Sequence, residues 1–290
     1  MDWWQAIILG IVEGLTEYLP VSSTGHLILT QRAMGLSGEA ANAYAICIQG
    51  GAIVAVLGLY AQRVRQGVLG SLGSVGLLKA KDPAGARLTR NLIVAFIPAA
   101  ILGRLFDDAI EQYLFGLWPI ISAWIIGGLA ILVVDAWRKR KEPVADAKPG
   151  LGIDDMTWRM ALIIGLLQCV AMWPGTSRSL MTIVAGVLVG LSLVAAVEFS
   201  FLIGVVTLLA ATLYKAIDAG PVMLEVYGWT PMLIGTIAAW ASAVVAVRWM
   251  VSYLQRHGLA VFGWYRVALG IIVAALVLAG VLSDDTGITP

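Results

Sequence analysis

Long apolar segments, separated by short polar connectors, dominate the pattern of hydrophobic and polar positions along this chain. Six of them approach the roughly 20 residues that a membrane-spanning helix needs. They are predicted at about residues 42–62, 91–106, 115–137, 193–216, 229–250 and 260–282; the second is short, which leaves an earlier start open. The pattern predicts an all-α polytopic membrane protein.

Two further apolar stretches are each broken into a pair of short arms. The arms are predicted at about residues 3–19 and 23–34, and at 157–173 and 176–191. Pro20 breaks the first pair and Pro174 the second, because proline ends a helix. Arms this short favour two re-entrant helix pairs, which a membrane tolerates only where protein or a wet cavity covers the tip. A single kinked spanning helix is the alternative for each pair.

Composition agrees with the membrane class. Of the 290 residues, 60% are hydrophobic and only 13% are charged, whereas about a quarter are charged in soluble domains. The net charge of +1 gives no general argument for binding nucleic acid, so membrane lipid is the expected surrounding partner. Cys47 and Cys169 lie in apolar segments, which argues against a disulfide framework and a metal site at either one.

The charges of the connectors alternate along the chain. Basic residues gather at 63–90, 138–148 and 248–256, and acidic ones at 107–111, 218–225 and 284–285. The positive-inside rule places the basic connectors in the cytoplasm and the acidic ones outside. Both termini are then expected outside, with the first broken pair entering from outside and the second from the cytoplasm.

This opposition predicts an inverted repeat within a single membrane domain, residues 1–290. The first repeat covers 1–137, a cytoplasmic linker 138–156, and the second repeat 157–290, each repeat with one re-entrant pair and three transmembrane helices. The aligned positions are Gly10, Glu13 and Tyr18 with Gly165, Gln168 and Trp173, and then, after a one-residue gap, Pro20 and Ser23 with Pro174 and Ser177. Interrupted helices at matching places point to a site near the midplane. Chance similarity between apolar segments is the alternative.

The first break carries most of the candidate chemistry. Glu13 and Glu17 lie one helical turn apart, and carboxylates at membrane depth must share a proton, meet a cation or reach water. Mg2+ and Ca2+ prefer carboxylate and phosphate oxygens, so these two residues are the candidate metal ligands; a buried structural pair is the alternative. The hydroxyls of Ser22, Ser23 and Thr24 precede a helix start, whose free amides favour a phosphate.

Histidine and the second break supply the remaining candidates. His26 can share a helix face with Ser23 and serve as base, acid or nucleophile, or it can simply satisfy the backbone. Arg178, at the second helix start, is suited to a bidentate phosphate contact, and it can also neutralise Glu13 or Glu17. Other candidate substrate contacts are Gly175, Thr176, Ser177, Ser179, Thr182 and Gln49. Capping the helix is the more common role of the hydroxyls of Ser177, Ser179 and Thr182. Gln49 and Glu198 are more readily explained as supports of the loops than as catalytic groups, and His257 is expected to be solvated.

These motifs resemble a known family, the undecaprenyl-diphosphate phosphatases, also called bacitracin-resistance proteins. Glu13-Gly-Leu-Thr-Glu17-Tyr-Leu-Pro-Val-Ser-Ser23-Thr-Gly-His26 is similar to the family's first motif, and Pro174-Gly-Thr-Ser177-Arg178-Ser179 with Thr182 to its second. The segments Ile48-Gln49 and Glu198-Phe-Ser-Phe also resemble family stretches, in order along nearly the whole chain. Leu180 departs from the family, which usually has glycine there.

The resemblance implies a multi-pass enzyme of the bacterial cytoplasmic (inner) membrane that hydrolyses undecaprenyl diphosphate to undecaprenyl phosphate and inorganic phosphate. Such an enzyme recycles the lipid carrier of cell-wall glycans and confers bacitracin resistance, with its site open to the external side. The resemblance also implies that Glu13 and Glu17 bind a divalent cation and assist water, that Ser23 and His26 do the transfer, and that Arg178 holds the diphosphate. A homodimer is left open.

The favoured mechanism is attack by Ser23 after His26 removes its proton, with the isoprenoid tail left in the lipid. Attack by His26 itself or by metal-bound water stays open. Two other classes compete: a transporter or flippase of phosphate-bearing polyprenyl lipid, and a non-catalytic resistance or scaffold protein. All catalytic readings require Glu17, from the front half, and Arg178, from the rear half, to converge on one anion.

Overall fold

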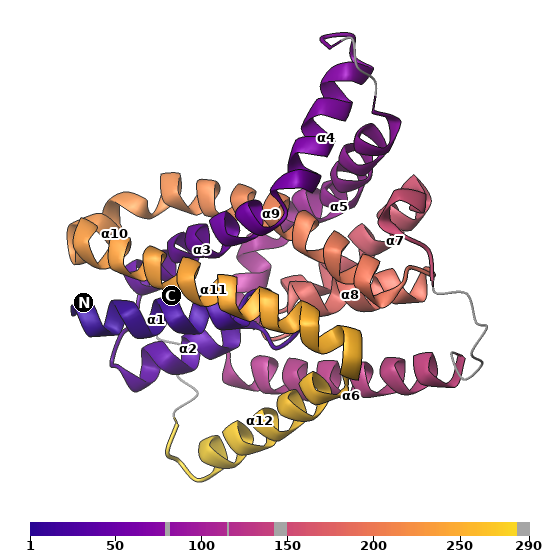
Figure 1. The fold of residues 1–290 in the computed structure, drawn as a ribbon. Coiled ribbons are helices and arrows are strands. Elements are labelled where there is room, and N and C mark those ends of the chain that lie inside the picture. The colour runs from indigo at the N-terminus through magenta and orange to yellow at the C-terminus, as the bar shows by residue number, and fades with distance from the viewer. Residues whose placement is uncertain (79–81, 115, 142–149, 283–290) are drawn as a thin grey trace.

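The computed structural model describes residues 1–78, 82–114, 116–141 and 150–282. Within these ranges the chain is helical and contains no strand. Figure 1 shows the helices. They are α1 (Trp3–Thr16), α2 (Ser23–Ala33), α3 (Glu39–Leu59), α4 (Ala61–Ser74), α5 (Pro83–Leu114), α6 (Leu117–Lys141), η1 (Ile153–Asp155), α7 (Trp158–Gln168), η2 (Cys169–Met172), α8 (Arg178–Leu188), α9 (Leu193–Asp218), α10 (Gly220–Tyr227), α11 (Trp229–His257) and α12 (Ala260–Leu278).

Six of these helices are long and apolar enough to cross a membrane: α3, α5, α6, α9, α11 and α12. They coincide with the six predicted spans, and the second begins at Pro83, earlier than its apolar pattern alone marks. Many large apolar side chains on them are exposed, as on Ile126, Leu233 and Ile271, which suits a surface that faces lipid. The all-α, multi-pass membrane class is therefore confirmed.

The polar connectors contain more helix than the sequence reading assigned. Residues 63–90 were expected as a charged connector, but α4 occupies its first part and the start of α5 its last part. The two helices pack against each other and project from the body of the molecule (Figure 1). The connector around residues 218–225 holds α10. Parts of the predicted linker 138–156 and of the acidic end, including 284–285, lie outside the described residues.

The two broken segments have the predicted short arms. In one, α1 and α2 lie side by side; in the other, α7, extended by η2, lies beside α8 (Figure 1). We call residues 17–22 the first tip and residues 173–177 the second tip. Polar residues at and beside both tips are buried, among them Glu13 and Glu17 at the first and Ser177 and Ser179 at the second.

Each short pair packs on a long helix from the other half of the chain. The main partner of α1 is α11, and that of α7 is α5. Glycine permits both crossings: a Cβ on Gly10 would lie 2.3 Å from the carbonyl oxygen of Gly235, and one on Gly165 would lie 2.4 Å from that of Ala95. Such small-residue contacts let membrane helices approach closely. The halves are consequently interlocked, and the tips are held by both.

Candidate active site

The two tips meet through an ion pair. Arg178, the first residue of α8, donates from Nη2 to Oε1 of Glu17 at 3.0 Å. The side chains are only 12% and 5% exposed, so the pair is largely removed from water. Nη1 of Arg178 also donates to the Ser200 carbonyl of α9 at 2.9 Å. The predicted convergence of an acid from the front half with the arginine from the rear half is confirmed.

Both tips end in a serine with the same unusual backbone. Ser22 has φ 73° and Ser177 has φ 79°, and they are the only non-glycine residues with positive φ in the described part of the chain. Such conformations cost about 1–3 kcal/mol and concentrate at functional sites. Each serine immediately precedes a helix, α2 or α8, so each tip aims the amides of a helix start toward the junction of the halves.

The two helix starts differ in their caps. The Ser177 hydroxyl accepts a hydrogen bond from the Leu180 amide at 3.3 Å, whereas the Ser22 side chain caps no amide of α2. The first amides of α2 are therefore left without a side-chain acceptor. Unpaired amides at a helix start are suited to an anion.

Ser23 is bonded to an acid, and not to the expected histidine. Its hydroxyl donates a short hydrogen bond to Oε2 of Glu17. His26 uses Nδ1 on the Ser22 carbonyl, at 2.6 Å, and Nε2 on the Tyr265 hydroxyl, at 2.7 Å. Because a carbonyl only accepts, Nδ1 carries a proton, and in a neutral ring Nε2 accepts from Tyr265. The expected Ser23–His26 contact is thus wrong, and the group placed to take the Ser23 proton is Glu17.

Glu13 lies one turn before Glu17, and its carboxylate has no hydrogen-bond donor among the described residues. It is fully buried, and neither of its carboxylate oxygens accepts a hydrogen bond from any residue that the structure describes. A buried carboxylate in that state needs a proton or a cation. Among the described residues no three acidic, histidine or cysteine side chains cluster as a complete metal site. Two carboxylates do fit a hard divalent cation that takes its other ligands from phosphate oxygens and water.

The hydroxyls of the second motif bond to protein. Ser179 is fully buried and donates to the Leu19 carbonyl of the first tip at 2.8 Å. Thr182, also fully buried, bonds to the Arg178 carbonyl at 3.0 Å and to the Ser200 hydroxyl at 2.7 Å. These two candidates lie behind the tips and support them. The predicted substrate contacts Thr24, Gly175, Thr176 and Ser177 lie at the tips or in the first turn after them.

The sequence analysis expected Glu198 to support one of the broken segments, but its side chain does not contact a tip. It accepts from Nε of Arg63 at 2.7 Å, and Arg63 also pairs with Asp154 at 3.1 Å. Burial alone would lower the pKa of Arg63, but its hydrogen bond with Glu198 and the two acidic charges raise that pKa. Gln49 is half-buried in α3, and its side chain forms no hydrogen bond with the residues that the structure describes. His257, as predicted, is exposed.

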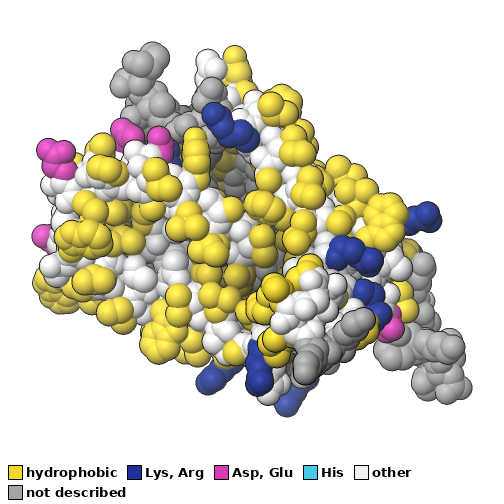
Figure 2. Space-filling model, turned by 90° about the horizontal axis from the view of Figure 1, so that it is seen from above, with side chains coloured by type: hydrophobic (Ala, Val, Ile, Leu, Met, Phe, Trp, Pro, Cys, Tyr) yellow, Lys and Arg dark blue, Asp and Glu magenta, His cyan; other side chains and the backbone are white. Residues whose placement is uncertain are grey.

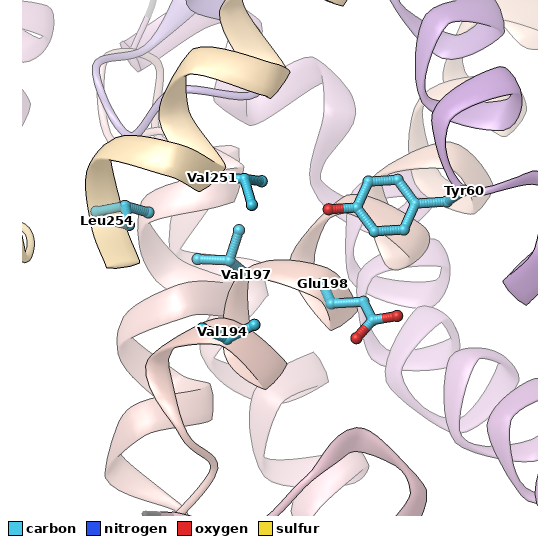
Figure 3. Close-up of a pocket in the computed structure, with 6 residues that line it drawn as sticks. All are labelled: Tyr60, Val194, Val197, Glu198, Val251 and Leu254. Atoms are coloured by element: carbon cyan, nitrogen blue, oxygen red, sulfur yellow. The ribbon is translucent and has the colours of Figure 1, made fainter. Parts of the chain in front are cut away.

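Glu198 instead lines a separate cavity of about 180 Å³ (Figure 3). The lining residues are Tyr60, Val194, Val197, Glu198, Val251 and Leu254. None of these lining residues belongs to either tip. The Phe201 ring packs against Tyr60 of the cavity and against Tyr18 of the first tip, with ring centroids 5.8 Å and 5.3 Å apart. The cavity is therefore distinct from the junction of the tips.

Sequence reasoning missed the residues that α12 and α6 bring to the tips. Tyr265 reaches His26, Arg266 donates to carbonyls of both tips, and the Trp124 indole donates to the Val21 carbonyl at 3.1 Å. Arg266 could have been singled out from the sequence, because an arginine within the apolar segment 260–282 is costly and usually marks a functional position. Trp124 could not, since a tryptophan in a span is ordinary.

Leu180, the departure from the family pattern, fills the core. It is 2% exposed and packs toward α6, where a Cβ on Gly127 would lie 3.0 Å from Leu180 Cδ2. Its side chain therefore removes none of the reactive groups at the tips.

Comparisons with known proteins agree over almost the full length. The chain matches the family described as bacitracin resistance protein BacA over residues 6–272. It is 42% identical over 274 residues to an undecaprenyl-diphosphatase of Sorangium cellulosum, covering 94% of this chain and 86% of that protein. It is 43% identical over 288 residues to an undecaprenyl-diphosphatase of Nitrosospira multiformis, covering 97% of this chain and 98% of the relative. Because the family match covers nearly the whole chain and these relatives are more than 40% identical, the chain belongs to the bacitracin resistance protein BacA family.

Proposed function

We propose that this protein hydrolyses undecaprenyl diphosphate to undecaprenyl phosphate and inorganic phosphate, and thereby recycles a cell-wall lipid carrier and confers bacitracin resistance. The observation that carries the proposal is the chain of contacts Ser23–Glu17–Arg178, which joins a nucleophile, an acid and a phosphate-binding cation across the two tips. The names of the relatives support the substrate class. Membrane helices around the tips suit a polyprenyl diphosphate, since its tail can remain in lipid while its diphosphate enters.

The reaction follows from the contacts of Ser23. Arg178 and the uncapped amides of α2 bind the diphosphate and neutralise its charge. The Ser23 oxygen forms a bond to the terminal phosphorus as its proton passes to Glu17, and the bond from that phosphorus to the bridging oxygen breaks. Undecaprenyl phosphate leaves. Water then attacks the phosphoserine, inorganic phosphate departs, and the Ser23 oxygen regains its proton.

A divalent cation, Mg2+ or Ca2+, is proposed as the cofactor, held by Glu13 and Glu17. The unpartnered oxygens of Glu13 support this assignment. When bound, the ion supplies further neutralisation of phosphate charge. We expect phosphate release to fall steeply after chelation with EDTA and to return with added Mg2+ or Ca2+. Full activity in excess chelator would contradict the assignment and would favour a proton on Glu13.

The finer topology is also a proposal: an inverted repeat of re-entrant pairs in one domain, residues 1–290. The matching conformations of Ser22 and Ser177 and the matching crossings at Gly10 and Gly165 support it. The helix starts support an alignment of the two repeats without the predicted one-residue gap. In this alignment Ser22 corresponds to Ser177 and Ser23 to Arg178.

The orientation rests on charge. In Figure 2 the acidic side chains gather mainly at the left end, where Figure 1 places α10 and the N-terminus, and most of the basic ones lie toward the other end. In the inner membrane this orientation puts both termini outside and opens the site externally. Labelling of single cysteines from one side of the membrane tests the orientation. A mass measurement in detergent decides between a monomer and a homodimer, which the sequence leaves open.

Purified protein with a C55 diphosphate tests the activity itself. Phosphate release is expected from the native protein and from Ser252→Ala, an exposed serine, but not from Ser23→Ala. A radiolabelled terminal phosphate trapped by acid quenching should map to Ser23. Label on His26, or normal turnover by Ser23→Ala, would replace the serine route by attack from histidine or water. If the native protein released no phosphate from the C55 diphosphate, the proposed activity would be wrong.

A further inference from the structure

Arg266 of α12 joins the two tips. It is fully buried, and its guanidinium donates to the carbonyls of Pro20 at 3.2 Å and of Gly175 at 2.8 Å, one in each tip. It also donates to the Ala123 carbonyl of α6 at 2.8 Å. None of its described contacts is with a carboxylate. A charge buried on backbone carbonyls alone is costly, so this arginine needs a role that justifies the cost.

Arg266 is one of four donors that hold consecutive carbonyls of the first tip. The Leu19 carbonyl accepts from Ser179, that of Pro20 from Arg266, that of Val21 from Trp124, and that of Ser22 from His26. Each donor is a side chain, and three of them come from α6, α8 and α12. Every carbonyl in the run from Leu19 to Ser22 is therefore fixed from outside the tip.

Fixing the carbonyls also fixes the amides. In a trans peptide the carbonyl and the amide of one peptide group point in opposite directions. The amide of Ser22 therefore points away from Trp124, and the amide of Ser23 points away from the His26 ring. The Ser22 amide directly precedes α2 and the Ser23 amide is the first of α2, the uncapped helix start that is suited to an anion. At the second tip, the carbonyl of Gly175 is held in the same way just before Arg178.

We propose that Arg266 is a positioning residue for diphosphate cleavage: it sets the amides of the first tip and Arg178 of the second in register around one phosphate. Trp124 assists it at the next carbonyl. This inference rests on the proposed hydrolase activity for its kinetic consequence, but the clamp itself is a property of the fold. Arg266 touches backbone only and is assigned no contact with substrate.

Arg266→Lys is the principal variant, because one ammonium cannot reach carbonyls on three separate segments. Its control is Arg256→Lys, an exposed arginine at the end of α11. We expect kcat to fall about 100-fold and inhibition by vanadate, a mimic of the transferring phosphoryl group, to weaken in proportion. KM should change by less than about threefold, since ground-state binding is preserved in part by Arg178.

Hydrogen–deuterium exchange supplies a readout that needs no activity. Peptides covering 17–26 and 173–179 should exchange faster in Arg266→Lys than in the native protein, while the control leaves both unchanged. If Arg266→Lys does not fold, Trp124→Phe replaces it; loss of the single indole donor should lower kcat about tenfold and loosen residues 17–26 alone.

The outcomes separate the two proposals. A folded Arg266→Lys with kcat within about twofold of native, or with unchanged exchange at both tips, overturns the positioning role. Equal losses of vanadate and substrate binding at unchanged kcat also overturn it, because they mark a general binding defect. A native protein that releases no phosphate overturns the hydrolase proposal, while faster exchange at both tips would still support the clamp.

Discussion

The two tips have the same backbone and different chemistry. Each has a short helix before it, a serine in the left-handed region at its end, and an 11-residue helix after it. Glu17 in the first tip has Glu13 and Ser23 on either side of it, and the helix start after this tip is uncapped. Arg178 directly follows the second tip, and Ser177 caps its helix. Repeating one shape has therefore produced two halves that supply opposite charges to one place.

This difference teaches that the shape of a tip does not by itself create the site. Gln168 occupies the position in α7 that Glu13 occupies in α1, and like Glu13 it is buried with no partner among the described residues. The first tip has kept a carboxylate there and the second a neutral amide. Substitutions that make the tips more alike, or that disturb only one of them, test how strictly the acidic and basic roles are divided between the two tips.

Removing the cation from the second tip should have the largest effect. Arg178→Gln takes away the phosphate-binding guanidinium and leaves Glu17 buried without its partner. We expect phosphate release to fall about 1,000-fold. Arg256→Gln is the matched control and should leave turnover unchanged. Activity of Arg178→Gln within tenfold of native would show that the first tip holds the anion without it.

Making the first tip resemble the second is the next test. Glu13→Gln gives α1 the side chain that α7 has at Gln168, and should lower turnover about 100-fold by weakening the support of the phosphate charge. Gln168→Met, which removes a buried unpaired amide, should leave turnover nearly unchanged and stability equal or higher. Similar losses for both variants would mean that the tips do not divide the chemistry. Phosphate release and thermal unfolding in detergent supply the measurements.

The two glycine crossings should respond alike in stability. A Cβ on Gly10 or on Gly165 would meet a backbone oxygen of the opposite helix. Gly10→Ala and Gly165→Ala should each destabilise the protein by about 1–3 kcal/mol, seen as a lower unfolding temperature. Gly35→Ala is not a suitable control, because Gly35 has positive φ; Gly50→Ala is suitable, since nothing lies within 4 Å of its added Cβ. A loss at only one crossing would break the parallel between the halves.

The smallest effect is expected at the caps. Ser177→Ala removes the hydrogen bond to the Leu180 amide and should cost about 1 kcal/mol of stability. Ser22→Ala removes no cap and should unfold at the native temperature. Equal shifts in unfolding temperature would contradict the difference that we describe between the two helix starts.

Much of the arrangement could be predicted from apolar runs and charges. The six spans, the short arms beside Pro20 and Pro174, and the approach of Glu17 to Arg178 follow from segment length, helix-breaking residues and the cost of isolated charges. These are local or pairwise properties. Their consequences do not depend on the path that the chain takes between the helices.

The partner of Ser23 could not be predicted in this way. Helical spacing favours His26, one turn away in the same helix, over Glu17, which lies across the tip. The left-handed backbone at Ser22 turns Ser23 back toward Glu17, and no residue pattern marks serine for that conformation. The clamp by Arg266 was missed because its partners are carbonyls, which every residue possesses.

The position of Arg266 in the chain has a consequence for biosynthesis. It lies in α12, which follows every other helix that the structure describes. A nascent chain that has not yet made α12 lacks this donor for the buried Pro20 and Gly175 carbonyls, and a buried carbonyl that loses its donor is costly. Nearly all of the protein must therefore be synthesised before α1 and α2 can reach their final arrangement. A product that ends before α12 is expected to be a target for membrane proteases.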